Sequence, residues 1–166
     1  MTYRVHNLAG AQPIADTSTT QKHPLGTIAV ATDPTYGQAE FIYLLGVAST
    51  VVGSIVSYNA TTYLTALGVA VSLVPRPMAV AMSANVASQY GWYQISGLAV
   101  CAKSSAVSFA AGAAVGVLST ATGLAAATAS GNELQGALVA AVASAASGRT
   151  TVTVLVNRPH MQGRIT

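Results

Sequence analysis

Charged residues are scarce in this sequence. Asp, Glu, Lys and Arg together make up 7% of the 166 residues, whereas globular domains ordinarily contain about 25%. The seven basic residues give a net charge of +3 but stand singly along the chain. A nucleic-acid-binding surface needs such residues clustered on one face. We therefore expect no nucleic-acid partner.

Cysteine is nearly absent, because Cys101 is the only one in the chain. It can form neither an intramolecular disulfide nor a Cys-x-x-Cys metal or redox site. Within the apolar segment LAVCAKSS, we interpret it as a buried small hydrophobic residue. A domain of about this length buries roughly 70% of the surface that its unfolded chain exposes. Folding should therefore need neither a disulfide nor an oxidising compartment.

Residues and motifs for catalysis are few as well. The chain contains four acidic residues and three histidines, and it lacks Gly-x-Ser-x-Gly, Gly-x-Gly and Gly-Lys motifs. Asp33 and Glu40 are a weak candidate pair for a cation site on a loop. His160 has no evident metal-binding partners in the sequence. We expect no enzymatic activity, no metal site and no cofactor.

Long apolar runs suitable for a membrane are also missing. The mean hydropathy is +0.53, and the most apolar window is residues 41–58, about the length of a spanning helix. That window contains two glycines, several hydroxyl residues and many β-branched residues, which favour strands. It has no Lys or Arg close to either end to orient it. The first 20 residues lack the apolar stretch of a signal peptide. We expect no membrane partner.

Short β-strands separated by turn residues account best for what is present. Residues 1–25 show no apolar periodicity, and we expect an extended N-terminal arm that is ordered only when a partner holds it. Residues 26–166 are expected to form a single β-rich domain. Residues 149–158 alternate clearly and should form a strand that stops at Pro159. Five glycines break up the alanine-rich segment 108–147, although one short helix fits within 134–147.

A weak internal repeat relates residues 53–100 to residues 112–159 when the chain is shifted by 59 positions. The segment VAMSANVASQYGWYQI at 80–95 then corresponds to VAAVASAASGRTTVTV, which contains no aromatic residue. Trp92, the only tryptophan, is therefore an addition to the strand-turn-strand unit, expected to pack against the core or a neighbouring subunit. The tyrosines could instead form a platform for carbohydrates or bases, but strand tyrosines more often bury the ring.

The chain also resembles a known family. HPLGTIAVATDPTYGQAEFIYLLGVAST, GSIVSYNATTYLTAL and AVAMSANVASQYGWYQISGLAV look like segments of the small virion proteins that decorate or cement the capsids of tailed bacteriophages. GAAVGVLSTATGLAAATA and GALVAAVASAASGRTTVTVLVNRP are similar to the glycine-bounded strands of those proteins. The resemblance covers residues 23–159. It implies a compact all-β fold, a β-barrel or β-sandwich that is jelly-roll-like or tulip-like.

The resemblance also implies a function and partners. Such a protein binds the outer surface of an assembled capsid, commonly as a homotrimer, and ties neighbouring major capsid proteins together. No catalytic residue carries over. The alternative is a head-fibre or tail-associated virion module that binds a host surface or glycan through exposed tyrosines. The residues expected to contact the capsid or another subunit are Tyr3, Arg4 and His23 in the arm, Arg76 and Arg158 in the two Arg-Pro pairs, and Trp92.

Overall fold

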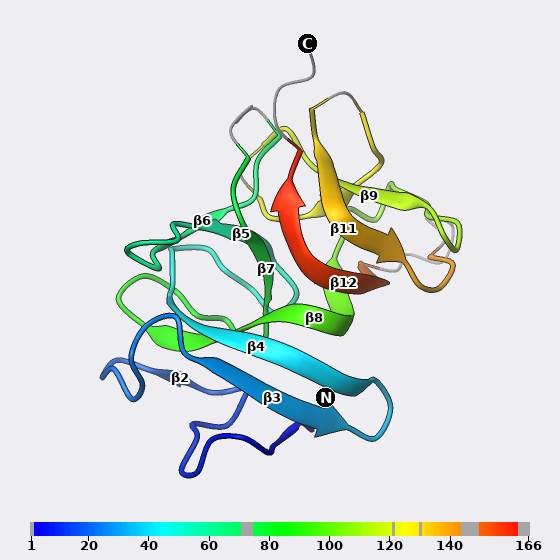
Figure 1. Ribbon diagram of the computed structural model, residues 1–166. Coiled ribbons are helices and arrows are strands. Elements are labelled where there is room, and N and C mark those ends of the chain that lie inside the picture. Colours follow the sequence, from blue (N-terminus) through cyan, green and yellow to red (C-terminus); the bar gives the residue numbers. More distant parts are fainter. Residues whose placement is uncertain (1, 71–74, 121, 130, 144–149, 163–166) are drawn as a thin grey trace.

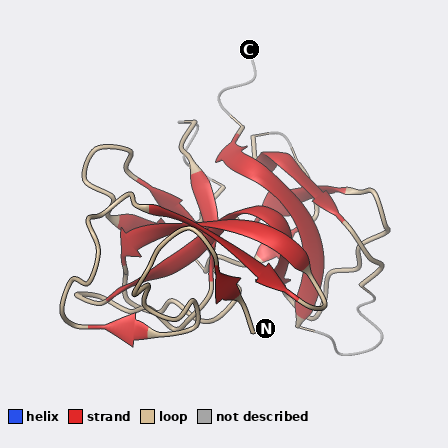
Figure 2. Cartoon of the chain, turned by 60° about the horizontal axis from the view of Figure 1, so that its bottom comes forward, coloured by secondary structure: helices blue, strands red, loops and turns tan. Residues whose placement is uncertain are grey.

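The protein is all-β, as a computed structural model shows (Figures 1 and 2). The structure describes residues 2–70, 75–120, 122–129, 131–143 and 150–162, and these residues include no helix. The strands are β1 (Arg4–Val5), β2 (Thr17–Ser18), β3 (Ile28–Asp33), β4 (Gly37–Leu45), β5 (Ile55–Tyr58), β6 (Thr65–Leu67), β7 (Met78–Ala81), β8 (Tyr90–Ala102), β9 (Ala114–Val117), β10 (Ala125–Ala126), β11 (Glu133–Val139) and β12 (Thr151–Met161). The predicted all-β class is therefore confirmed.

The strands form one sheet that does not close into a barrel. Its main path runs β1-β3-β4-β8-β12-β11-β9-β10, and all of these neighbours are antiparallel. The long strand β8 lies at the centre, paired with β4 on one side and β12 on the other, and also with β2 and β7 near its start. Gly97 lets β8 turn between these partners, since its φ is +95° and a Cβ there would lie 2.7 Å from the Gln38 carbonyl oxygen.

Two groups of four strands repeat the same pairings. In the first, β5 pairs with β6 and β7, and β7 pairs with β8; in the second, β9 pairs with β10 and β11, and β11 pairs with β12. Strands β5 and β9 begin at residues 55 and 114, an offset of 59. In the antiparallel β8–β12 pair, Gly97 lies opposite Val156, and these two residues are also 59 positions apart. The strand pairings in the described parts of residues 53–100 and 112–159 thus correspond at an offset of about 59 positions.

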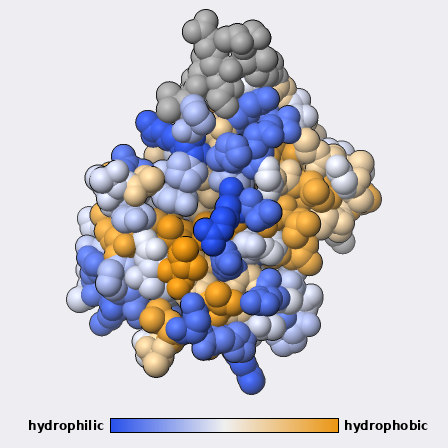
Figure 3. Space-filling model, viewed as in Figure 1, coloured by the Kyte–Doolittle hydropathy of each residue, from blue (hydrophilic) through white to orange (hydrophobic). Residues whose placement is uncertain are grey.

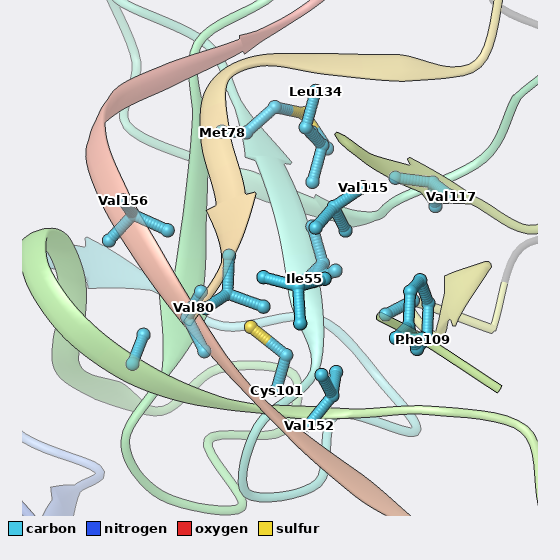
Figure 4. Close-up of a cluster of buried hydrophobic side chains, with 14 of the residues drawn as sticks. Ile55, Met78, Val80, Cys101, Phe109, Val115, Val117, Leu134, Val152 and Val156 are labelled. Carbon is cyan, nitrogen blue, oxygen red and sulfur yellow. The ribbon is translucent and has the colours of Figure 1, made fainter. Parts of the chain in front are cut away.

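Buried side chains from both groups meet in the largest core cluster, shown in Figure 4. Ile55, Val80 and Cys101 from the first group point toward Val115 and Val152 from the second. The alternation predicted for the last strand is confirmed, because the valines at 152, 154 and 156 are all buried. The strand nevertheless continues past Pro159 to Met161, so the predicted stop is wrong. Pro159 lies at an irregular part of the ladder, where the β11–β12 register shifts.

The segment that could hold a short helix contains a strand instead. Residues 134–139 belong to β11, in which Leu134 and Val139 are buried and Gly136 and Leu138 are exposed. A helix is excluded at Gly136, because the φ of this residue is +78°, outside the helical region. Residues 144–149 lie outside the described residues, so the end of the predicted range is not covered.

The N-terminal segment lies against its own domain and is not a free arm. Strand β1 pairs with β3, and β2 pairs with the start of β8, so residues 2–25 run along the sheet below β3 and β4 in Figure 1. Ile14 is 4% exposed and packs in a second core cluster with Phe41 and Trp92. The expectation that residues 1–25 become ordered only on a partner is therefore corrected for the described part of the segment.

Candidate interaction surfaces

Trp92 joins the central strand to the N-terminal segment. Register sets it opposite Tyr43 of β4, and the two rings meet edge to face with centroids 5.0 Å apart. Its indole is fully buried, and Nε1–H donates a hydrogen bond to the Gln12 carbonyl oxygen at 2.9 Å. A buried indole N–H ordinarily needs such an acceptor. Trp92 is thus part of the core, one of the two roles that the sequence left open.

Gln12 forms three further hydrogen bonds in and beside this cluster. Its backbone N–H donates to Nε2 of His23 at 3.1 Å, and its side-chain Oε1 accepts from the Tyr43 hydroxyl at 3.0 Å. Its Nε2 donates to the Asp16 carbonyl oxygen at 2.8 Å. The His23 ring packs against Tyr43 and Trp92, with centroid separations of 5.1 and 5.4 Å. His23 is therefore half-buried in the chain's own aromatic cluster.

Tyr3 is also held by the domain. Its ring contacts Phe41 edge to face at 4.8 Å, and burial, assisted by the nearby Asp33 carboxylate, raises the pKa of Tyr3 to about 12. Burial would raise the pKa of Asp33, but hydrogen bonds from the backbone N–H groups of Thr35, Thr2 and Tyr36 lower it overall. Arg4, by contrast, is exposed on β1. Of the three arm residues predicted as contacts, only Arg4 is freely accessible.

The two Arg-Pro pairs come together in space. Pro77 forms an antiparallel bridge with His160, and the Arg76 carbonyl oxygen accepts a hydrogen bond from the Met161 backbone N–H at 2.9 Å. Arg76 and Arg158 are both exposed. The Arg158 guanidinium lies 2.8 Å from a carboxylate oxygen of Glu40 on β4, and 60% of the Arg158 side chain is exposed. The sequence therefore identified the two Arg-Pro pairs without indicating that the segments containing them are paired.

A row of leucines crosses the outer face of the sheet. Leu98 of β8 is opposite Leu155 of β12, which is opposite Leu138 of β11. Leu155 and Leu138 are each 43% exposed, and Leu98 is half-buried. Directly paired residues share one face of a sheet, so the three side chains form a continuous apolar strip, which we call the leucine row. Figure 3 shows hydrophobic surface over β11 and β12 in this region.

Polar groups border the leucine row. Ser96 and Asn157 are paired two positions away from the Leu98–Leu155 pair, and Glu40 is opposite Ser96. The Arg158–Glu40 ion pair therefore lies at the same end of the face. Sequence reasoning missed this surface. The sequence contains one indication of it, because Leu155 is an apolar residue at an outward position of an alternating strand. Which residues lie beside Leu155 depends on the strand register, which the sequence does not give.

Chemically reactive groups do not gather anywhere in the part of the chain that the structure describes. No three His, Cys, Asp or Glu side chains there are close enough to hold a metal ion. Cys101 is buried, which raises the pKa of its thiol to about 12. No protein-family model and no curated protein matches the chain. Among the described residues, no helix is long and apolar enough to cross a membrane.

Proposed function

We propose that this protein is a structural component of a tailed-bacteriophage particle, a decoration protein that binds the outer capsid surface and stabilises the shell. The observation that carries the proposal is the leucine row with its polar border. The cores of protein interfaces are depleted in charge, while their rims are polar and accessible. The outer face around Leu98, Leu138 and Leu155 has this composition, and it lies on the central strands of the sheet, where the backbone is held on both sides.

The capsid surface is the proposed occupant of this face. Burying apolar surface contributes about 25 cal/mol per Å², so three leucines alone supply only modest affinity. The resemblance to decoration proteins suggests a homotrimer that binds several capsid subunits at once, and linked contacts raise the overall affinity far above that of each one. Arg158, exposed at one end of the row, would add a polar contact to the major capsid protein, and the exposed Arg76 is a further candidate contact.

The tyrosines weigh against the alternative of a glycan-binding fibre or tail module. All seven tyrosines and Trp92 belong to the described residues, and each is buried or half-buried. Tyr43 and Tyr93 are fully buried. An aromatic platform for sugar binding needs well-exposed rings, and none of these eight side chains falls in the exposed class.

A binding assay with two matched variants tests the proposal. Capsids that lack the protein are mixed with wild-type protein, with Leu155→Lys and with Val51→Lys, and bound protein is measured after sedimentation. Val51 is 51% exposed in the loop before β5, away from the leucine row, so it controls for the added charge. We expect Leu155→Lys to lose most binding and Val51→Lys to retain it. Equal binding by both variants, each folded as judged by circular dichroism, would contradict the proposed face.

A further inference from the structure

His23 joins two parts of the N-terminal segment that are eleven residues apart. It follows β2 in the sequence, and its Nε2 accepts the backbone N–H of Gln12, eleven residues earlier. The Gln12 carbonyl oxygen in turn accepts the indole N–H of Trp92. The backbone of a single residue, Gln12, in the loop before β2 is thereby held between the imidazole and the central strand of the sheet.

The direction of the His23 hydrogen bond is fixed by its donor. A backbone N–H can only donate, so Nε2 must carry a lone pair and cannot be protonated while the bond exists. In the imidazolium form both ring nitrogens are donors. Protonation would therefore set two N–H groups against each other and remove the acceptor that holds Gln12.

The groups around His23 do not replace that acceptor. Asp16 and Lys22 line the same open hollow, of about 480 Å³, and Tyr43 and Trp92 pack against the ring. Tyr90 stacks on the far side of Tyr43. Among the described residues the only ion pair joins Arg158 to Glu40, so no carboxylate lies at ion-pair distance from His23. The aromatic rings would attract an imidazolium, but they offer Gln12 no hydrogen-bond acceptor.

We propose that His23 is a pH-sensitive latch for the backbone around Gln12. At neutral pH the unprotonated ring holds Gln12 over Trp92 and Tyr43. Protonation removes this hydrogen bond and loosens the backbone around Gln12, while Ile14 stays in the core cluster and β2 stays paired with β8. This inference concerns the isolated chain and does not depend on the proposed function.

The indole signal of Trp92 allows a direct test, because the chain has one tryptophan. In ¹⁵N-labelled protein, the hydrogen-exchange protection of this N–H is measured from pH 7.5 to pH 5.5, corrected for the intrinsic dependence of exchange on pH. Losing the hydrogen bond should lower protection about tenfold at the acidic end, the factor that corresponds to about 1.4 kcal/mol. His23→Gln keeps an amide oxygen as a non-titrating acceptor, so its protection should stay constant.

Control measurements separate the latch from general acid effects. His160 is exposed on β12, and His160→Gln should follow the wild-type profile. The ring ¹⁵N shifts of His23 in the wild-type protein should show an unprotonated Nε2 at pH 7.5, a readout that needs no substitution. A protonated Nε2 at that pH, constant wild-type protection, or the same pH dependence in His23→Gln would each overturn the proposal.

Discussion

Replacing Trp92 with alanine should strongly destabilise the fold. The indole is fully buried between β4, β8 and the N-terminal segment, so the substitution leaves a cavity in the aromatic cluster. Losses for buried Trp-to-Ala substitutions are about 3–5 kcal/mol, a large part of the 5–15 kcal/mol that typically stabilises a domain. The Gln12 carbonyl also loses its donor. We expect the free energy of unfolding to fall by about 4 kcal/mol.

Urea denaturation followed by far-ultraviolet circular dichroism measures this loss, since the variant lacks the tryptophan that fluorescence would need. With a slope of about 2 kcal/mol/M, a loss of about 4 kcal/mol lowers the midpoint by about 2 M. Val142→Ala is the control, because Val142 is 65% exposed and surface substitutions change stability by about 0.5 kcal/mol or less. If Trp92→Ala lowered the midpoint no more than Val142→Ala does, the claim that Trp92 holds the N-terminal segment against the sheet would be refuted.

Two further outcomes follow from buried ionisable groups. Cys101 should not react with a thiol reagent at pH 8 in the native protein and should react fully in denaturant, because burial raises its pKa to about 12; rapid native labelling would contradict the packing of β8. The pKa of Asp33 is lowered in the folded state, so its stabilising effect is present above about pH 4, its ordinary pKa, and is lost as the pH falls through the folded-state value. Asp33→Asn should therefore be less stable than the wild-type protein at pH 7, and its melting temperature should fall less on acidification. A fall equal to that of the wild-type protein would argue against the Thr2 contact.

The all-β class and the last strand could be predicted from the sequence because each depends on local pattern. Val152, Val154 and Val156 alternate with polar or exposed residues, and a strand with one buried face requires that alternation. The same reasoning failed at Pro159, where a register shift between β11 and β12 accommodates a residue that a regular ladder would exclude. Reasoning from the sequence also allowed a short helix within 134–147, where Gly136 has a positive φ.

The N-terminal segment and the candidate surface could not be predicted in this way. Residues 2–25 have no periodicity because isolated side chains hold them: Ile14 in the core and Gln12 through its hydrogen bonds. The leucine row depends on the register of three strands distant in sequence, and Leu155 alone does not reveal its neighbours. Lys103 would be expected on the surface, yet it is 2% exposed and donates to two backbone carbonyls.

Under the proposed function, electron cryomicroscopy of phage particles that contain the protein is the most direct test. The account predicts density for the protein at regular positions of the capsid lattice, in numbers close to those of the shell subunit, with Leu98, Leu138 and Leu155 facing the major capsid protein. Density confined to the tail or to a few fibres, or lattice-bound copies whose leucine row faces solvent, would contradict it.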